Sequence, residues 1–178
     1  PVVLTRPITP PQEEKKDAAD RMSAMRLAEL SRTEQMLSAA KALVEKINVV
    51  VGQNSQSIKE AIVDSKVNWV LQKEQLGTGH AVQQATPYIE DSSMCLILYA
   101  DVPLIQRNTI EELLNKASSS GFALLSVILE NPFGYGRIIR DSNQSIQSII
   151  EQKDASKEQL KVKEINTGIM AIKGSLLK

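Results

Sequence analysis

The chain has 178 residues, and 42% of them are hydrophobic, which is enough for one folded domain and excludes a wholly disordered protein. Its 21 basic and 21 acidic residues cancel, which argues against a protein that binds nucleic acid through its phosphates. The single Cys95 and the single His80 exclude a disulfide framework and a multi-histidine metal site. Because it has no long apolar run and no signal peptide, we expect a soluble, cytoplasmic protein.

Short apolar segments alternate along the chain with segments of helical periodicity. We expect strands at 1–5, 47–51, 69–71, 94–99, 122–129 and 164–172, several of them apolar on both faces. Helices are expected at 36–46, 57–63, 78–89 and 109–118, the last with Thr109 as its N-cap. This alternation predicts an α/β protein with a mainly parallel, doubly wound sheet, followed after Gly134 by a hairpin-like extension.

The first informative motif is WVLQKEQLGTGHA at 69–81, where a strand leads through a loop into a helix. Gly77 would let the backbone approach a ligand, and the helix start offers free N–H groups. Thr78 adds a hydroxyl, and Gln72 offers a donor and an acceptor to the edge of a planar base. The same letters also fit an ordinary strand–helix turn, and His80 is interpreted as a hydrogen-bonded structural residue. Neither the dinucleotide-binding nor the P-loop pattern matches.

The remaining motifs place polar residues at or within apolar strands. In LILYADVPLI at 96–105, Asp101 follows a strand and would either hold Mg²⁺ or cap the next turn. In IIEQKDA at 149–155 and EINTGIM at 164–170, Glu151 and Asn166 either face solvent or bind a ligand, for which sugar hydroxyls are suitable. In NPFGYGRIIR at 131–140, Gly134 and Gly136 mark a tight turn.

In their order and spacing these motifs closely resemble the uridyltransferase domain of one family, the bacterial bifunctional N-acetylglucosamine-1-phosphate uridyltransferase/glucosamine-1-phosphate acetyltransferases. The resemblance covers residues 38–172. It implies a Rossmann-like three-layer α/β/α sandwich of the nucleotide-diphospho-sugar transferase type. It also implies that UTP and N-acetylglucosamine 1-phosphate give UDP-N-acetylglucosamine and pyrophosphate, with Mg²⁺ and without a protein nucleophile.

The resemblance further implies roles for individual residues and for partners. The nucleotide would be contacted by Gln72, Gly77 and Thr78. The sugar would be contacted by Tyr99, Gly136, Glu151 and Asn166. The metal ligand would be Asp101. UTP and N-acetylglucosamine 1-phosphate would be the small-molecule partners, with no nucleic acid and no membrane. Full-length family members would be homotrimers through a domain that this chain lacks.

The sequence also departs from the family pattern. The family's glycine-rich loop L-A-A-G-x-G-T-R-M, which wraps the phosphates, is replaced by RPITPP at 6–11, and prolines have no N–H to donate. Ala100 and Phe133 replace a usual glycine and threonine. The chain stops before the family's second metal ligand and its β-helix. We therefore expect a single nucleotidyltransferase domain at 1–178, truncated at its C-terminal end and without acetyltransferase activity.

Two alternative functions remain open at this point. The replaced loop favours a catalytically impaired fragment or relative that only binds nucleotide or a protein partner. A nucleotidyltransferase for another sugar phosphate is the other alternative, against which EINTGIM and IIEQKDA argue. Competition between N-acetylglucosamine 1-phosphate and glucose 1-phosphate would distinguish it.

Overall fold

The structure, a computed structural model, describes residues 2–5, 17–53, 55–64, 66–99 and 105–178. Within these ranges eight strands form one sheet in the order β3-β2-β1-β4-β8-β6-β7, and β5 pairs with the remaining edge of β8. In chain order the strands are β1 (Val2–Thr5), β2 (Ile47–Val51), β3 (Val67–Leu71), β4 (Met94–Tyr99), β5 (Phe122–Ile128), β6 (Arg137–Arg140), β7 (Ile146–Ile150) and β8 (Glu164–Lys173).

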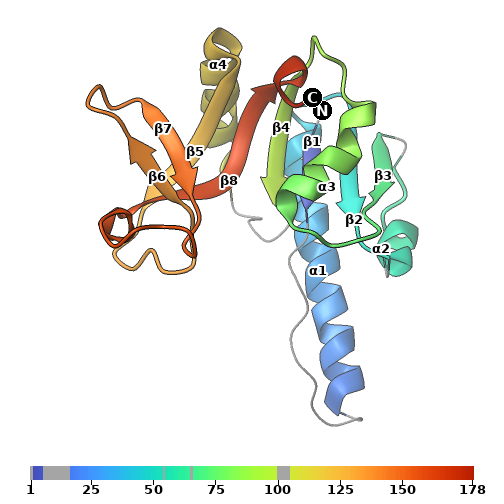
Figure 1. Cartoon of the computed structure of the whole chain (residues 1–178). Helices are drawn as coiled ribbons and strands as arrows, with labels where there is room; N and C mark the ends of the chain where they lie inside the picture. Colours follow the sequence, from blue (N-terminus) through green and yellow to red (C-terminus); the bar gives the residue numbers. More distant parts are fainter. Residues whose placement is uncertain (1, 6–16, 54, 65, 100–104) are drawn as a thin grey trace.

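Helices cover both faces of this sheet, which confirms the three-layer α/β/α arrangement (Figure 1). The helices are α1 (Asp17–Lys41), α2 (Gln56–Ala61), α3 (Thr78–Ala85) and α4 (Arg107–Ser120), with short 3-10 turns η1 (Thr86–Tyr88), η2 (Gln159–Lys161) and η3 (Gly174–Leu176). Side chains of α1, α2 and α4 pack on one face, and α3 packs on the other. None of the helices in the described ranges is long and apolar enough to cross a membrane.

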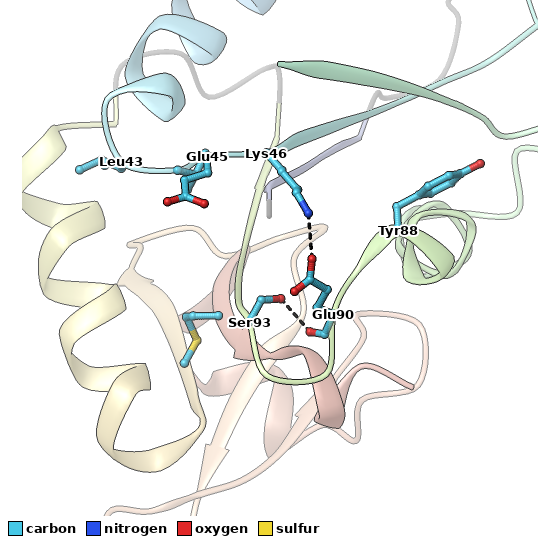
Figure 2. A pocket seen from close by; sticks show the side chains of 8 residues that line it. Leu43, Glu45, Lys46, Tyr88, Glu90 and Ser93 are labelled. Carbon is cyan, nitrogen blue, oxygen red and sulfur yellow. Dashed lines mark hydrogen bonds and ion pairs between the residues drawn. The ribbon is translucent and has the colours of Figure 1, made fainter. Parts of the chain in front are cut away.

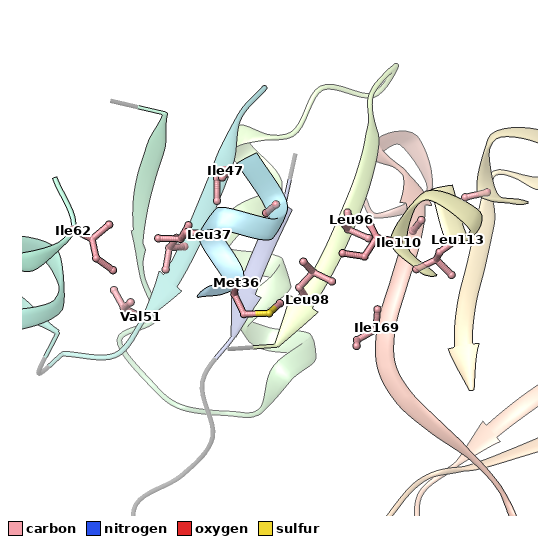
Figure 3. Close-up of a cluster of buried hydrophobic side chains, with 14 residues drawn as sticks. Met36, Leu37, Ile47, Val51, Ile62, Leu96, Leu98, Ile110, Leu113 and Ile169 are labelled. Atoms are coloured by element: carbon pink, nitrogen blue, oxygen red, sulfur yellow. The ribbon is translucent and has the colours of Figure 1, made fainter. Parts of the chain in front are cut away.

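The alternation of side chains along each strand divides the core into two clusters. In β4, Leu96 and Leu98 pack with α1 and α4, while Cys95 and Ile97 pack with α3, because successive residues of a strand point to opposite faces. Figure 3 shows the first cluster, in which Met36 of α1 meets the strands. Burial raises the pKa of the Cys95 thiol to about 11, so the thiol stays protonated and unreactive at neutral pH.

The sheet is mixed, which corrects the expectation of a mainly parallel sheet. β1 to β4 run parallel to one another, whereas β8 runs antiparallel to β4, β5 and β6. β4, α4 and β5 form a strand–helix–strand unit with parallel strands, and β8 fills the space between those two strands. Between β5 and β8, within 105–178, the chain contains a hairpin and η2 but no α-helix, so it lacks the crossover that parallel pairing needs.

β8 joins the main sheet to the hairpin expected after Gly134. The end of β8, Met170–Lys173, pairs with β4, and Ile165 near its start pairs with Arg137 of β6 on the same edge. β6 and β7 form the antiparallel hairpin, and Figure 1 shows β8 running from this hairpin toward β4. β8 therefore holds the hairpin beside the carboxyl end of β4.

Several helix ends differ from those predicted. α1 runs from Asp17 to Lys41 rather than over 36–46. Residues 17–35 lack a regular apolar stripe, so periodicity did not predict a helix there. They are rich in Ala, Glu, Arg and Met, which favour the helix that the structure shows. The first part of α1 projects away from the sheet (Figure 1). α4 begins at Arg107 with Gln106 as its N-cap, so Thr109 is not the N-cap. α3 is shorter than predicted, since η1, with its proline, follows it.

Candidate functional site

The end of β3 leads into the glycine loop that the sequence indicated. Gln72 directly follows β3, and its backbone N–H donates to the carbonyl of Val51 at the end of β2 (2.9 Å). Its side chain is almost buried, and the amide nitrogen donates to the carbonyl of Gly77 (3.1 Å). The structure therefore brings Gln72 and Gly77 together at the carboxyl ends of the parallel strands.

Gly77 is the N-cap of α3 and turns the chain into that helix. Its φ of 101° lies in the left-handed region, where a side chain would be strained, and the space beside its Cα is open. Thr78, the first residue of α3, is exposed next to it. An open helix start of this kind can donate backbone N–H groups to a ligand oxygen.

His80 continues the hydrogen-bonded chain that starts at Gln72. Its Nδ1 lies 3.1 Å from the amide nitrogen of Gln72, and its Nε2 lies 3.1 Å from the amide nitrogen of Gln84, one turn further along α3. His80 is half-buried, and both ring nitrogens have partners. The prediction of a hydrogen-bonded histidine is therefore confirmed.

The four predicted sugar contacts gather around the end of β4 and the start of β8. The backbone N–H of Asn166 donates to the carbonyl of Gly136 (2.8 Å). Gly136 is buried against Glu151, since a Cβ on this glycine would lie 3.2 Å from the carboxylate oxygen Oε1. The ring of Tyr99 lies against Gly168, two residues beyond Asn166. The turn before β6, the end of β7 and the start of β8 thus meet beside β4.

A bulge in β8 shapes this part of the site. The pairing with β5 shifts between Leu124 and Ser126, so that residues 167–169 of β8 face Leu125 alone. The hydroxyl of Thr167 donates to the carbonyl of Leu125 (2.5 Å), and the side-chain oxygen of Asn166 accepts from the N–H of Gly168 (2.8 Å). Gly168 has a φ of 76°, which favours glycine. The bulge holds the Asn166 side chain at a fixed place.

Arg137 links the turn before β6 to the segment after β7, a role that the sequence analysis missed. It is 2% exposed, and its guanidinium donates to the carbonyl of Tyr135 and to the side-chain oxygen of Gln152 (2.8 Å). The same oxygen accepts from the N–H of Gly134 (3.2 Å). Among the described residues Arg137 forms no ion pair, and its Nε is buried without a partner. The signal available in the sequence was an arginine directly before two isoleucines, Ile138 and Ile139.

An ion pair fastens β6 to the start of β8. Arg140 donates from Nε and Nη2 to the two carboxylate oxygens of Glu164 (2.8 and 2.7 Å), and the hydroxyl of Ser126 donates to Glu164 as well (2.6 Å). These contacts, Arg140 first, lower the pKa of the Glu164 carboxyl below its usual value of 4.5. Glu164 in turn raises the pKa of Arg140.

We expect this ion pair to give the protein an acid-sensitive contribution to stability. Because the pKa of Glu164 is lower in the folded than in the unfolded state, the contribution is full above the usual pKa of 4.5 and is lost as the pH falls through the folded pKa. The pair is partly exposed, so the contribution is at most about 1 kcal/mol. Urea unfolding at about pH 6 and about pH 3.5 measures it.

Glu164→Gln should lower the free energy of unfolding at the higher pH and lower it by less at the lower pH. Glu130→Gln is the matched control, because Glu130 pairs with Lys163 (2.7 Å) but is 93% exposed. Equal effects of the two variants at both pH values would contradict the prediction.

The predicted metal ligand lies outside the described residues. Asp101 and Ala100 fall in the gap at 100–104, and the RPITPP segment falls in the gap at 6–16. Within the described ranges, no group of three His, Cys, Asp or Glu side chains is arranged to hold a metal ion. The role of Asp101 stays a prediction.

A surface pocket of about 250 Å³ lies at the amino ends of the parallel strands, where β2 and β4 begin (Figure 2). Lys46 and Glu90 point toward one another across it and form an ion pair of 2.8 Å, and Tyr88 stands beside them. The pair raises the pKa of Lys46 and lowers that of Glu90. Both side chains are largely exposed, so the pair adds little stability. None of the predicted site residues lines this pocket.

Solved structures share the fold. HddC from Yersinia pseudotuberculosis aligns with 99% of this chain and 77% of its own, with a TM-score of 0.61 and 21% identity. A putative glucose-1-phosphate thymidylyltransferase from Bacillus anthracis aligns with 99% of this chain and 72% of its own, with a TM-score of 0.67 and 13% identity. These likenesses show the fold of this chain, an α/β/α sandwich with two groups of polar residues at the carboxyl ends of its parallel strands.

The chain belongs to the family of MobA-like NTP transferase domains, which matches residues 21–154. It is 57% identical over 143 residues to the bifunctional protein GlmU of Ruthia magnifica subsp. Calyptogena magnifica, covering 80% of this chain and 31% of that protein. It is 46% identical over 144 residues to the bifunctional protein GlmU of Marinobacter nauticus, covering 80% of this chain and 32% of that protein. The resemblance seen in the motifs is confirmed. The chain spans about a third of the length of these curated relatives.

Proposed function

We propose that this chain transfers a uridylyl group from UTP to N-acetylglucosamine 1-phosphate, giving UDP-N-acetylglucosamine and pyrophosphate. The observation that carries the proposal is that the predicted nucleotide and sugar contacts lie at the carboxyl ends of the parallel strands. Gln72 and Gly77 follow β3, whereas Tyr99 ends β4, and these two strands run in the same direction. In α/β sheets, ligands bind beyond the carboxyl ends of the strands.

The proposed chemistry needs no nucleophile from the protein. An oxygen of the sugar phosphate attacks the α-phosphorus of UTP, and the bond from that phosphorus to the pyrophosphate oxygen breaks. Gln72 and the open backbone at Gly77 hold the nucleotide, and Glu151 and Asn166 hold the sugar hydroxyls. Because phosphoryl transfer depends mainly on positioning and charge stabilisation, fixing both substrates in line supplies much of the rate.

Asp101 is the proposed ligand for Mg²⁺. A carboxylate is the hard oxygen donor that Mg²⁺ prefers, and Asp101 follows the last residue of β4 by two positions in the sequence. When bound, the ion would neutralise charge on the phosphate oxygens. A cytoplasmic location and trimeric full-length relatives stay predictions.

The test is release of pyrophosphate from UTP and N-acetylglucosamine 1-phosphate in the presence of Mg²⁺. Asp101→Asn should lower turnover at least about a hundredfold, because the carboxylate charge that holds the ion is lost. Its thermal unfolding should stay within about two degrees of that of the unaltered chain.

Asp91→Asn is the matched control, because Asp91 is an exposed partner of Lys178 (2.6 Å) and precedes β4, at the amino end of that strand. It should keep full turnover. Full turnover in Asp101→Asn would overturn the metal assignment, and faster turnover with glucose 1-phosphate would overturn the choice of sugar.

A role limited to binding is the second candidate. It is favoured by the RPITPP segment at 6–11, whose prolines cannot supply the N–H groups that a phosphate-wrapping loop donates. Calorimetry with UTP distinguishes the two. Binding of UTP without any release of pyrophosphate supports this second candidate, whereas turnover rejects it.

A further inference from the structure

We propose that His80 is a positioning residue that fixes which end of the Gln72 amide faces the nucleotide base. The proposal rests on the proposed function, in which Gln72 contacts the base of UTP. It goes further, because it assigns the base preference to a histidine that need not touch the ligand.

The amide nitrogen of Gln72 has no N–H donor left for a ligand. A primary amide has two N–H donors, and this one has two partners: the carbonyl of Gly77 and Nδ1 of His80, both at 3.1 Å. A backbone carbonyl only accepts, so the nitrogen of the amide, and not its oxygen, must face Gly77. Both donors are therefore used within the protein.

The contact with Gln72 determines the tautomer of His80. A neutral imidazole has one donor and one acceptor, and Nδ1 must accept because Gln72 donates to it. The proton then sits on Nε2, which lies 3.1 Å from the amide nitrogen of Gln84. Because two donors cannot pair, the Gln84 amide must turn by 180° to accept this proton with its oxygen, and in that orientation it holds His80 in the tautomer that keeps the Gln72 amide in place.

The orientation of the Gln72 amide determines which base it can bind. With the nitrogen occupied, Gln72 offers only its oxygen, Oε1, to which no group in the described ranges donates a hydrogen bond. An acceptor suits the N3–H of uracil and opposes N3 of cytosine, which is itself an acceptor. The network therefore selects a pyrimidine that carries a ring N–H.

The experiment compares the dissociation constants of UTP and CTP for the unaltered chain and its variants by titration calorimetry. His80→Ala removes the acceptor, so the amide of Gln72 keeps only one of its two constraints and can turn. The preference for UTP should then fall about five- to tenfold, which is the loss expected from one hydrogen bond. A merely structural role would weaken both nucleotides alike.

His80→Asn is the rescuing variant, because its side-chain oxygen is bonded to Cγ as Nδ1 is and can accept from Gln72. It should keep the preference within about twofold. Gln83→Ala is the control, because Gln83 is an exposed neighbour in α3. It should leave the preference unchanged. In the unaltered chain, ¹⁵N chemical shifts of the His80 ring should show a proton on Nε2 alone.

An unchanged preference in His80→Ala, a loss in His80→Asn as large as that in His80→Ala, or a proton on Nδ1 would each overturn this proposal while leaving the uridylyl transfer standing. The ring shifts decide the matter even where His80→Ala fails to fold. If the unaltered chain binds neither nucleotide, the proposed function itself fails.

Discussion

Gly168→Ala is expected to lower the free energy of unfolding by about 3 kcal/mol, with two causes that add. The residue has a φ of 76°, so any side chain there is strained. A Cβ at this place would also lie 2.6 Å from Cζ of the Tyr99 ring, so the ring must move. Urea unfolding followed by circular dichroism measures the loss.

Gly134→Ala is the matched control for this prediction. Gly134 has a φ of 86°, but a Cβ there would meet nothing within 4 Å. It should therefore lose only the backbone part, about 1 kcal/mol. The difference between the two variants isolates the contact with Tyr99, and equal losses would show that the ring yields without cost.

Gly168→Ala should also weaken the proposed sugar site. Tyr99 and Asn166 are both held by the bulge around Gly168, so a displaced ring moves the proposed sugar contacts. We expect N-acetylglucosamine 1-phosphate to bind at least about tenfold more weakly to Gly168→Ala, while UTP binding changes little. Equal weakening of both ligands would argue against separate nucleotide and sugar contacts.

Arg137→Ala is expected to cost about 3 kcal/mol of folding free energy. The side chain is among the largest fully buried ones, so its removal leaves a cavity and breaks the links to Tyr135 and Gln152. Arg137→Met keeps most of the volume and removes a buried charge that has no ion pair in the described residues, so it should cost only about 1 kcal/mol. Thermal and urea unfolding measure both.

Arg140→Ala is the control on the same strand. Arg140 is paired with Glu164 near the surface, and its loss should lower stability by less than about 1 kcal/mol. If Arg140→Ala cost as much as Arg137→Ala, burial would not be what distinguishes the two arginines, and the account of Arg137 would be wrong.

The sequence was informative wherever both faces of a strand are covered. β2 and β4 were predicted closely because buried strands read as unbroken apolar runs. The direction of β8 was not predictable in the same way, because period and burial are the same for parallel and antiparallel strands. The antiparallel β8 follows from what connects it to β5, a hairpin without a crossover helix, and that depends on tertiary pairing.

The site was predictable as a set of motifs, and its supports were not. Gln72, Gly136 and Asn166 were found because their motifs stand in a recognisable order. Gly168 lies within EINTGIM, and an isolated glycine inside a strand does indicate a bulge. Nothing in the letters shows that Tyr99 would lie on it, since the two residues are far apart in the chain. Roles of residues in the gaps, Asp101 above all, stay predictions.

The position of β8 has a consequence for how the chain reaches its native state. β4 and β5 are made early, yet the strand that separates them comes from residues 164–173, so both keep an unpaired edge until that segment arrives. Such long-range pairing slows folding and leaves strand edges available to other chains in the meantime. Until residues 164–173 have left the ribosome, β5 and the β6–β7 hairpin stay separate from the sheet that contains β4, and the arrival of β8 joins these three parts.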